Sequence, residues 1–358
     1  MRFIFKTDYA QDINLAKHGG HVGWYGALIC ALILSPWLLD DYWLAQLTLI
    51  LIYSIVGLGL MLLAGFTGQF SLGHAAFLGI GAYTQAVAIN AGLPLIVALV
   101  GAMAFAALIG VIVAIPALRV RGVFLGMATL ALGIILEEAF ARWESVTGGN
   151  AGLFVQSPTL FGFEINEATP YYFLCLILTI LVTLGVANLL RSPTGRAFVA
   201  IRDSEISAQS MGIPLARYKT LAFAISAALT GLGGALYAHK IQFLTPEQFG
   251  IIQSIDLLLL IVIGGLGSIH GAFLGAIFLI TMPQIISIGK DYLAAGIGES
   301  PGLSAMVYGV VLVLFVLFEP LGLYGRWLKV RAYIQLFPLY RRGMFERQKS
   351  FQKSERLK

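Results

Sequence analysis

Charged residues are scarce in this chain. Only 11% of its 358 residues are Asp, Glu, Lys or Arg, whereas 58% are hydrophobic. A soluble domain usually carries about 25% charged residues, so this composition excludes a soluble globular protein. Apolar runs such as residues 43–65 reach the roughly 20 residues that a helix needs to cross a bilayer. We therefore expect an all-α, polytopic membrane protein.

Cysteine is nearly absent, and a phosphate-binding loop is missing. The two cysteines, Cys30 and Cys175, lie inside apolar runs, where packing is a commoner role than a disulfide or metal site. No G-x-x-x-x-G-K-[ST] run occurs: Gly289-Lys290 is followed by Asp291, with no glycine five residues earlier. No metal-ligand cluster or nucleophile–base pair stands out. The sequence therefore predicts no catalytic residue, metal or cofactor in this chain.

The apolar residues fall into runs separated by polar segments. The runs lie near residues 22–39, 43–64, 74–91, 93–115, 123–141, 170–190, 219–239, 255–287 and 303–319. The run at 255–287 is too long for one span and is cut by the sequence GGLGSIHG at 264–271, so we count it as two limbs. The result is about ten membrane-embedded helical elements.

The basic residues set the predicted orientation. Placing both termini in the cytoplasm puts segment 1–21, Arg119 and Arg121, loop 191–219 and tail 326–358 inside, and leaves only Arg142, Lys240 and Lys290 outside. This asymmetry is the one that the positive-inside rule predicts. A single span over 255–287 would put the basic tail outside, which favours the two limbs. The tail mixes aromatic and cationic residues, which indicates contact with anionic lipids rather than nucleic acid.

One motif occurs twice in the chain. A shift of 196 residues aligns six identities within a twelve-residue window, which predicts a duplicated unit. The identical residues are Gly68, His74, Ala76, Phe77, Leu78 and Gly79 in the first copy, and Gly264, His270, Ala272, Phe273, Leu274 and Gly275 in the second. Small residues spaced by four follow in both copies, Ser71, Ala75 and Gly79, then Gly267, Gly271 and Gly275. Small side chains at this spacing let helices pack closely in a membrane.

Repeated, glycine-interrupted apolar segments are typical of transporters whose pathway runs through broken helices. Backbone groups freed at membrane depth need protein or water partners, so such breaks tend to line a cavity. The predicted pathway residues are Gly68, Gln69, Ser71, Gly73, His74, Gly264, Gly265, Gly267, His270 and Gly271. The two histidines either hold the breaks together or serve as proton relays or ligand contacts. The charge-based topology makes the copies run in the same direction, although inverted repeats are common in transporters.

Four blocks of the sequence resemble a known family. They are GQFSLGHAAFLGIGAY, RWESVTGGNAG, SPTGRAFVAIRDSEISAQSMGI and GGLGSIHGAFLGA, in this order between residues 68 and 276. Together they resemble the permease subunits of high-affinity branched-chain amino-acid ABC importers of the LivM type. The resemblance implies a permease domain over 22–325 in a bacterial inner membrane. The implied partners are a second related permease, two ATPases that bind ATP, and an external solute-binding protein.

The polar loop 191–219 lies between two spans. Its Ser192-Pro193 pair and Gly195 mark a turn, and the residues after them suit one short helix that ends near Gly212. In the resembled family this loop carries the coupling helix that docks on the ATPase. Its implied coupling residues here are Gly195, Arg196, Arg202, Asp203, Glu205, Ala208 and Gly212. The last three keep the Glu, Ala and Gly of the general ABC permease signature only loosely.

Two alternatives remain open at this point. Permeases that import urea or short-chain amides share the glycine-rich block, so the substrate could be of that kind. An ATP-independent secondary transporter would need intramembrane acidic pairs, for which the chain offers only Glu137-Glu138 and Asp256.

Overall fold

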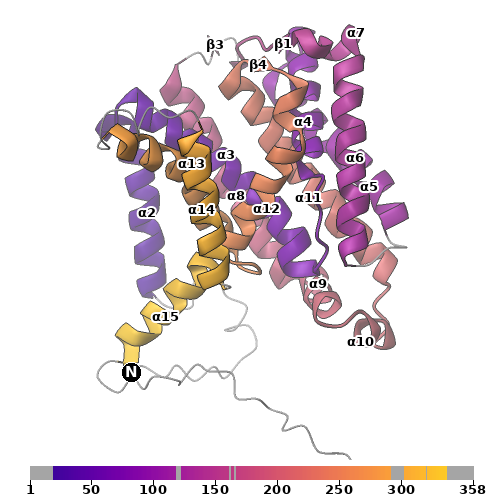
Figure 1. Cartoon of the computed structure of the whole chain (residues 1–358), viewed down its shortest axis with the longest axis vertical. Coiled ribbons are helices and arrows are strands. Elements are labelled where there is room, and N and C mark those ends of the chain that lie inside the picture. Colours follow the sequence, from indigo (N-terminus) through magenta and orange to yellow (C-terminus); the bar gives the residue numbers. More distant parts are fainter. Residues whose placement is uncertain are drawn as a thin grey trace, which may run out of the picture.

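The computed structural model describes residues 19–117, 122–160, 163–164, 167–291, 302–319 and 321–336. Most of the predicted N-terminal segment 1–21, and the tail beyond 336, lie outside the described residues. In Figure 1 one end of the helix bundle carries α9 (Pro193–Asp203) and α10 (Glu205–Ser210). The opposite end carries α7 (Glu144–Thr147), β1 (Leu153–Phe154) and β4 (Phe243–Leu244). We call these the α10 end and the β1 end.

Each predicted membrane element corresponds to a helix. The helices are α2 (Gly19–Leu38), α3 (Asp41–Leu60), α4 (His74–Asn90), α5 (Leu95–Ala117), α6 (Val123–Arg142), α8 (Ala168–Arg191), α11 (Leu215–Ile241), α12 (Ile251–Gly264), α13 (Ile269–Asp291) and α14 (Leu303–Phe318). Within the described residues, 7 segments are long and apolar enough to cross a membrane. The expected all-α polytopic fold is confirmed. The long apolar run is divided into α12 and α13, as its glycines predict.

The remaining elements are short and lie mostly at the two ends. The β1 end holds α7 (Glu144–Thr147), the 3₁₀ turns η2 (Gly149–Ala151) and η3 (Pro246–Phe249), and the strands β1 (Leu153–Phe154), β2 (Thr159–Leu160), β3 (Phe163–Glu164) and β4 (Phe243–Leu244). β1 pairs antiparallel with β4, Leu153 opposite Leu244, and β2 pairs antiparallel with β3. The α10 end holds α9 (Pro193–Asp203), α10 (Glu205–Ser210) and α15 (Gly322–Leu336).

The core is built around α11, which packs against α3, α4 and α5. Glycines make the closest approach possible: a Cβ atom at Gly81 would lie 2.0 Å from the carbonyl oxygen of Gly231. A Cβ at Gly234 would lie equally close, 2.0 Å, to the carbonyl oxygen of Leu78. Lipid offers helices little hydrophobic drive to associate, so such backbone contact supplies the packing energy instead.

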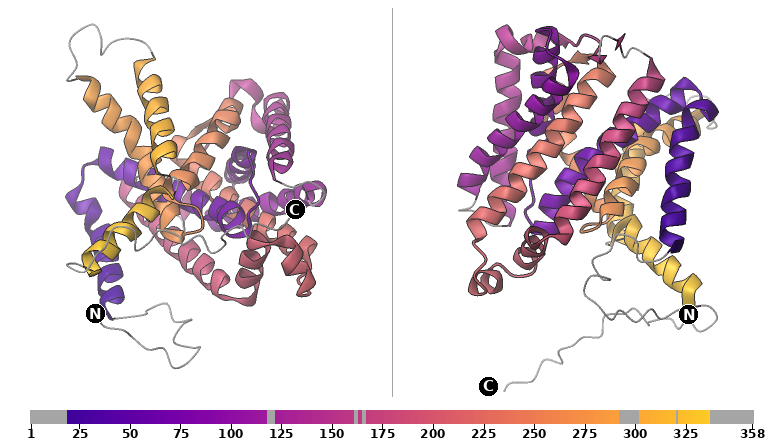
Figure 2. Two further views of the ribbon diagram at one scale, coloured as in Figure 1. Left: turned by 60° about the horizontal axis from the view of Figure 1, so that its bottom comes forward. Right: turned by 180° about the vertical axis from the view of Figure 1, so that it is seen from behind.

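The two copies of the repeat run in the same direction. α3 ends beside α9, because the Gly65 carbonyl accepts a hydrogen bond from Arg202, and α4 ends beside β1, where Asn90 donates to the Phe154 carbonyl at 2.8 Å. α12 starts after β4 and η3 at the β1 end, and α13 returns toward that end (Figures 1 and 2). The unit α3–α4 thus matches α12–α13 in direction, which agrees with the topology predicted from charge.

Candidate functional site: two helix breaks and the α9–α10 segment

Each copy of the repeat contains a break between two helices. The first break is residues 67–73, between the π-helical turn η1 (Met61–Phe66) and α4. The second break is residues 265–268, between α12 and α13. A π-helical turn is rare and often marks a functional site in a helix.

The first break is enclosed by neighbouring helices. A Cβ atom at Gly73 would lie 2.1 Å from the Thr129 carbonyl oxygen of α6, and the Leu72 N–H donates to the Thr129 hydroxyl at 3.0 Å. Gln69 is buried and donates to the Lys219 carbonyl of α11 at 3.4 Å. The Leu72 backbone N–H and the Gln69 side chain thus have protein partners in α6 and α11.

His74 ties this break to α11. Its Nδ1 lies 2.8 Å from the Ser71 hydroxyl and its Nε2 lies 2.8 Å from the Ser226 hydroxyl, and its side chain is fully buried. Both ring nitrogens are therefore occupied by protein partners. The geometry matches a histidine that holds a break together, and it leaves neither nitrogen facing a ligand.

The second break is a tight hairpin. A Cβ atom at Gly271 would lie 2.3 Å from the Gly265 carbonyl oxygen, and one at Gly264 would lie 1.9 Å from the Gly271 carbonyl oxygen. The Ser268 hydroxyl donates to the Gly265 carbonyl at 3.2 Å and accepts from the Gly271 N–H at 2.9 Å. The predicted close packing of Gly271 and its neighbours is present, and it joins α13 to α12.

His270 has a different environment from His74, although the repeat aligns them. It is exposed, and its Nε2 lies 2.7 Å from the Tyr25 hydroxyl of α2. Its ring stacks on Tyr324 of α15, with centroids 5.3 Å apart and an interplanar angle of 2°. The second break therefore contacts the first and last described helices of the chain.

The small-residue face predicted for the first copy is used differently from that of the second. Gly79 meets the aromatic rings of Phe140 and Phe249, and Ser71 contacts His74 rather than a neighbouring helix backbone. The closest helix contact of α4 is made by Gly81, which the repeat alignment does not include. Spacing alone does not show which small residue will face the partner helix.

The π-helical turn η1 meets the second break at the α10 end. A Cβ atom at Gly65 would lie 2.7 Å from the Gly267 backbone nitrogen. The Gly267 N–H in turn points to the Met61 sulfur at 3.2 Å. The π-helical turn before the first break therefore lies directly against the second break.

The loop after α8 forms two helices, so the expectation of one short helix is wrong. Ser192 caps α9 by accepting from the Gly195 N–H, and Ser204 caps α10 by accepting from the Ser207 N–H. Ser204 has the extended backbone of an N-cap residue, which ends α9 and starts a new helix. The predicted turn after α10 is present, and Gly212 adopts a left-handed conformation with φ of 82°.

The seven predicted coupling residues divide into inner and outer groups. Gly195 and Ala208 are buried, whereas Arg196, Arg202, Asp203 and Gly212 are exposed. Glu205 forms an ion pair of 2.5 Å with Lys219, whose side chain is buried at the start of α11. Arg202 reaches the breaks, with its Nη1 3.2 Å from the Gly65 carbonyl oxygen.

Several residues important to this arrangement escape sequence reasoning. Ile206 and Met211 of the α10 region are 77% and 86% exposed, and these two large apolar side chains in the mostly polar stretch 202–212 were a usable signal. Lys219 and Ser226 lie inside an apolar run, and nothing in their spacing links them to Glu205 and His74.

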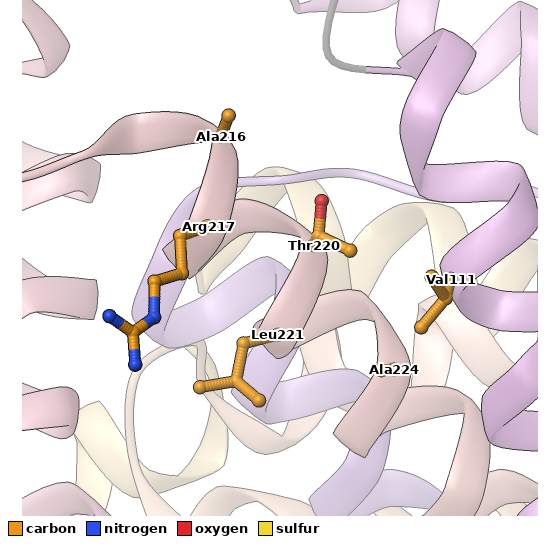
Figure 3. Close-up of a pocket in the computed structure, with 6 residues that line it drawn as sticks. All are labelled: Val111, Ala216, Arg217, Thr220, Leu221 and Ala224. Atoms are coloured by element: carbon orange, nitrogen blue, oxygen red, sulfur yellow. The ribbon is translucent and has the colours of Figure 1, made fainter.

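Two surface hollows lie away from both breaks. One hollow, of about 480 Å³, lies between α5 and α11. In Figure 3 Val111 and Arg217 lie on opposite sides of it, and the Arg217 side chain points away from Val111. This hollow is lined by Val111, Ala216, Arg217, Thr220, Leu221 and Ala224. The other, of about 630 Å³, lies at the β1 end among Glu137, Glu138, Glu144 and Glu247. Neither of the two is lined by a predicted pathway residue.

Comparison with known proteins gives a consistent result. The family described as "Branched-chain amino acid transport system / permease component" matches residues 42–316. The high-affinity branched-chain amino acid transport system permease protein LivM of Escherichia coli K12 is 32% identical over 324 residues, which cover 83% of this chain and 73% of that protein.

Other matches are more distant. The autoinducer 2 import system permease protein LsrC of Enterobacter sp. strain 638 is 29% identical over 248 residues, 66% of this chain and 68% of that protein. Among solved structures, PsaBC from Streptococcus pneumoniae in complex with Fab aligns over 85% of this chain and 99% of that chain, with a TM-score of 0.42 and 18% identity. The family match and the LivM relative show that this chain belongs to the permease components of branched-chain amino acid transport systems.

Proposed function

We propose that the chain is the permease subunit of an ATP-driven importer of branched-chain amino acids. It works with a second related permease, two ATPases and an external solute-binding protein. The family match and the LivM relative support this substrate class. The relatives named above are named for branched-chain amino acids or autoinducer 2, which favours this substrate over urea or short-chain amides.

The same proposal places the chain in a bacterial inner membrane with the α10 end in the cytoplasm. The described basic residues support this orientation, since Arg191, Arg196, Arg202, Arg217 and Lys219 lie in or beside α9 and α10. Lys and Arg are enriched in the cytoplasmic loops of membrane proteins. The β1 end, with its acidic hollow, then faces the external binding protein.

The observation that carries the ATPase partnership is the surface of α10. Ile206 and Met211 are almost fully exposed on a segment that lies beyond the membrane helices. Exposed apolar side chains beside charged residues are typical anchors at a protein interface. We assign them to a groove of the ATPase, with Arg196 and Asp203 at the rim.

The two breaks form the part of the permease that changes shape during transport. They hold no catalytic residue, and the chemistry of ATP hydrolysis lies in the partner subunits. Closely packed glycine contacts have discrete arrangements, which allows a small motion of the coupling segment to switch the helices between two states. The scarcity of ionisable side chains along the spans suits a small zwitterionic or neutral solute.

The test is to purify the full chain with the gene products expected to assemble with it. We expect the ATPase to copurify, and uptake by proteoliposomes to stop when ATP hydrolysis is blocked. Replacing both Ile206 and Met211 by Asp should reduce the retained ATPase about tenfold or more, since an interface anchor contributes about 2 kcal/mol. Binding of leucine, isoleucine, valine and urea by the external protein identifies the substrate.

Two results would contradict the proposal. One is uptake that continues at full rate without ATP hydrolysis. The other is a complex that keeps its ATPase unchanged in the doubly substituted variant, which would place the interface elsewhere. Arg217→Ala is a matched control, because Arg217 is also exposed at the α10 end but lies in the hollow between α5 and α11.

A further inference from the structure

Arg202 occupies a singular position at the last turn of α9. Its Nη1 donates to the Gly65 carbonyl oxygen at 3.2 Å, at the end of the π-helical turn before the first break. Its Cγ lies 3.3 Å from the point where a Cβ of Gly68 would stand. Its Nη1 lies 3.3 Å from the corresponding point at Gly267 of the second break. One side chain thus contacts both breaks.

The contact with Gly65 has a chemical reason. The helix ends at this turn, and the last carbonyl groups of a helix lack partners within it. A guanidinium group is a permanent cation with several N–H donors in a fixed fork, so it can satisfy such a carbonyl and keep a second partner. Here the second partner is Asp203, whose carboxylate accepts from the Nε and Nη2 of Arg202 at 3.1 and 2.9 Å.

Apolar side chains hold α9 against the membrane helices, so a motion of α9 also displaces Arg202 in its last turn. Phe198 and Ile201 are buried, with 0% and 2% of their surface exposed, and Phe198 packs edge-on to Tyr218 of α11. The helix is therefore seated on the membrane helices by apolar packing. Arg202 is its polar contact with the breaks at the end that leads into α10.

We propose that Arg202 is a positioning residue that joins the coupling segment to both breaks at once. This inference rests on the proposed function and names the link that the function needs. When α10 moves with the ATPase, the guanidinium carries the displacement to the Gly65 carbonyl and to Gly267. Asp203 orients the guanidinium for this purpose.

The experiment uses the assembled complex with Arg202→Ala and Arg202→Lys. Arg217→Ala is the matched control, because Arg217 is also an exposed arginine at the α10 end but lines the hollow between α5 and α11. The readouts are the ATPase retained, the rate of ATP hydrolysis and the solute imported per ATP. We expect Arg202→Ala to keep the ATPase and hydrolyse ATP while import per ATP falls about tenfold, the scale of a charge-assisted hydrogen bond.

The lysine variant separates charge from geometry. Lysine is a point charge without the planar fork, so it cannot hold Gly65 and Asp203 in the same way. We expect it to restore part of the coupling, to within about threefold of the wild type, and the Arg217→Ala control to match the wild type.

A distance measurement tests whether Arg202 holds the two breaks together. Spin labels at Phe70→Cys and Leu266→Cys mark the two breaks, since these side chains are 42% and 45% exposed. The background carries Cys30→Ser and Cys175→Ala to remove the native thiols. The label-to-label distance distribution should broaden in Arg202→Ala and stay unchanged in Arg217→Ala.

The outcomes distinguish the inference from the function on which it rests. Wild-type uptake that needs no ATP contradicts the proposed function. The proposed role of Arg202 is overturned if wild-type uptake needs ATP while Arg202→Ala shows unchanged coupling and an unchanged distance distribution. Loss of the ATPase from Arg202→Ala also overturns it, because Arg202 would then act through docking.

Discussion

The two breaks share a motif but have different surroundings. Around the first break, α6 and α11 supply the hydrogen-bond partners, and His74 is fully buried between two serines. The second break satisfies its own backbone through Ser268 and Gly271, and His270 lies exposed between α2 and α15. Both copies of the motif interrupt a helix, but their matching residues contact different partners.

The difference assigns distinct mechanical properties to the two copies. The first break is fixed by helices from other parts of the chain, so its shape depends on their positions. The second is braced within its own hairpin and contacts Gly65 through Gly267. We infer that the second break moves as a unit against the first, with Arg202 at their junction. The following variants test this comparison.

The largest effect is expected from Gly271→Leu in the second break. Its Cβ would lie 2.3 Å from the Gly265 carbonyl oxygen, a backbone atom that cannot move aside without opening the hairpin. Such overpacking against backbone should abolish uptake and lower the amount of folded protein. Gly267→Leu should block uptake as well, because Gly267 has a φ of 79° and abuts Gly65.

The control for this prediction lies on the same helix. Among the described residues, no heavy atom lies within 4 Å of the Cβ position of Gly289, so Gly289→Leu should leave uptake unchanged. Uptake assays with both variants, normalised to protein in the membrane, check the result. Normal uptake in both Gly267→Leu and Gly271→Leu would show that close packing at the second break is dispensable.

The aligned histidines give the sharpest comparison. His74→Ala removes the partner of two serine hydroxyls in a buried site and leaves a cavity, which should lower the free energy of unfolding by about 3 kcal/mol. His270→Ala removes an exposed contact, and the loss should stay within about 1 kcal/mol. Thermal stability in detergent, measured for both variants side by side, gives the difference. Equal losses would mean that the two environments do not differ in energy.

Much of the fold could be predicted from the sequence because it rests on local patterns. The apolar runs gave the helices, the sequence GGLGSIHG gave the boundary between α12 and α13, and the distribution of Lys and Arg gave the common direction of the two copies. Each pattern acts within one helix or one loop. The roles assigned to the site residues stay predictions.

The partners of the site residues could not be predicted, because they come from distant parts of the chain. Arg202 meets a carbonyl 137 residues away, and His74 meets Ser226 at a separation of 152. A backbone carbonyl carries no signal of its own in the sequence. The division of loop 191–219 at Ser204 was a local feature, and the serine caps before Gly195 and Ser207 were sufficient to predict it.

The smallest effect is expected from the serines that brace the two breaks. Ser71→Ala leaves the Nδ1 of His74 without its partner in a fully buried site, and should destabilise the protein by about 2 kcal/mol. Ser268→Ala removes two hydrogen bonds, but Ser268 is half-buried, so water can replace its hydroxyl and the loss should be about 0.5 to 1 kcal/mol. Unfolding of the two variants, compared at matched detergent, measures the difference. A larger loss for Ser268→Ala would show that the second break depends on its internal hydrogen bonds more than the first depends on its burial, which reverses the mechanical assignment made above.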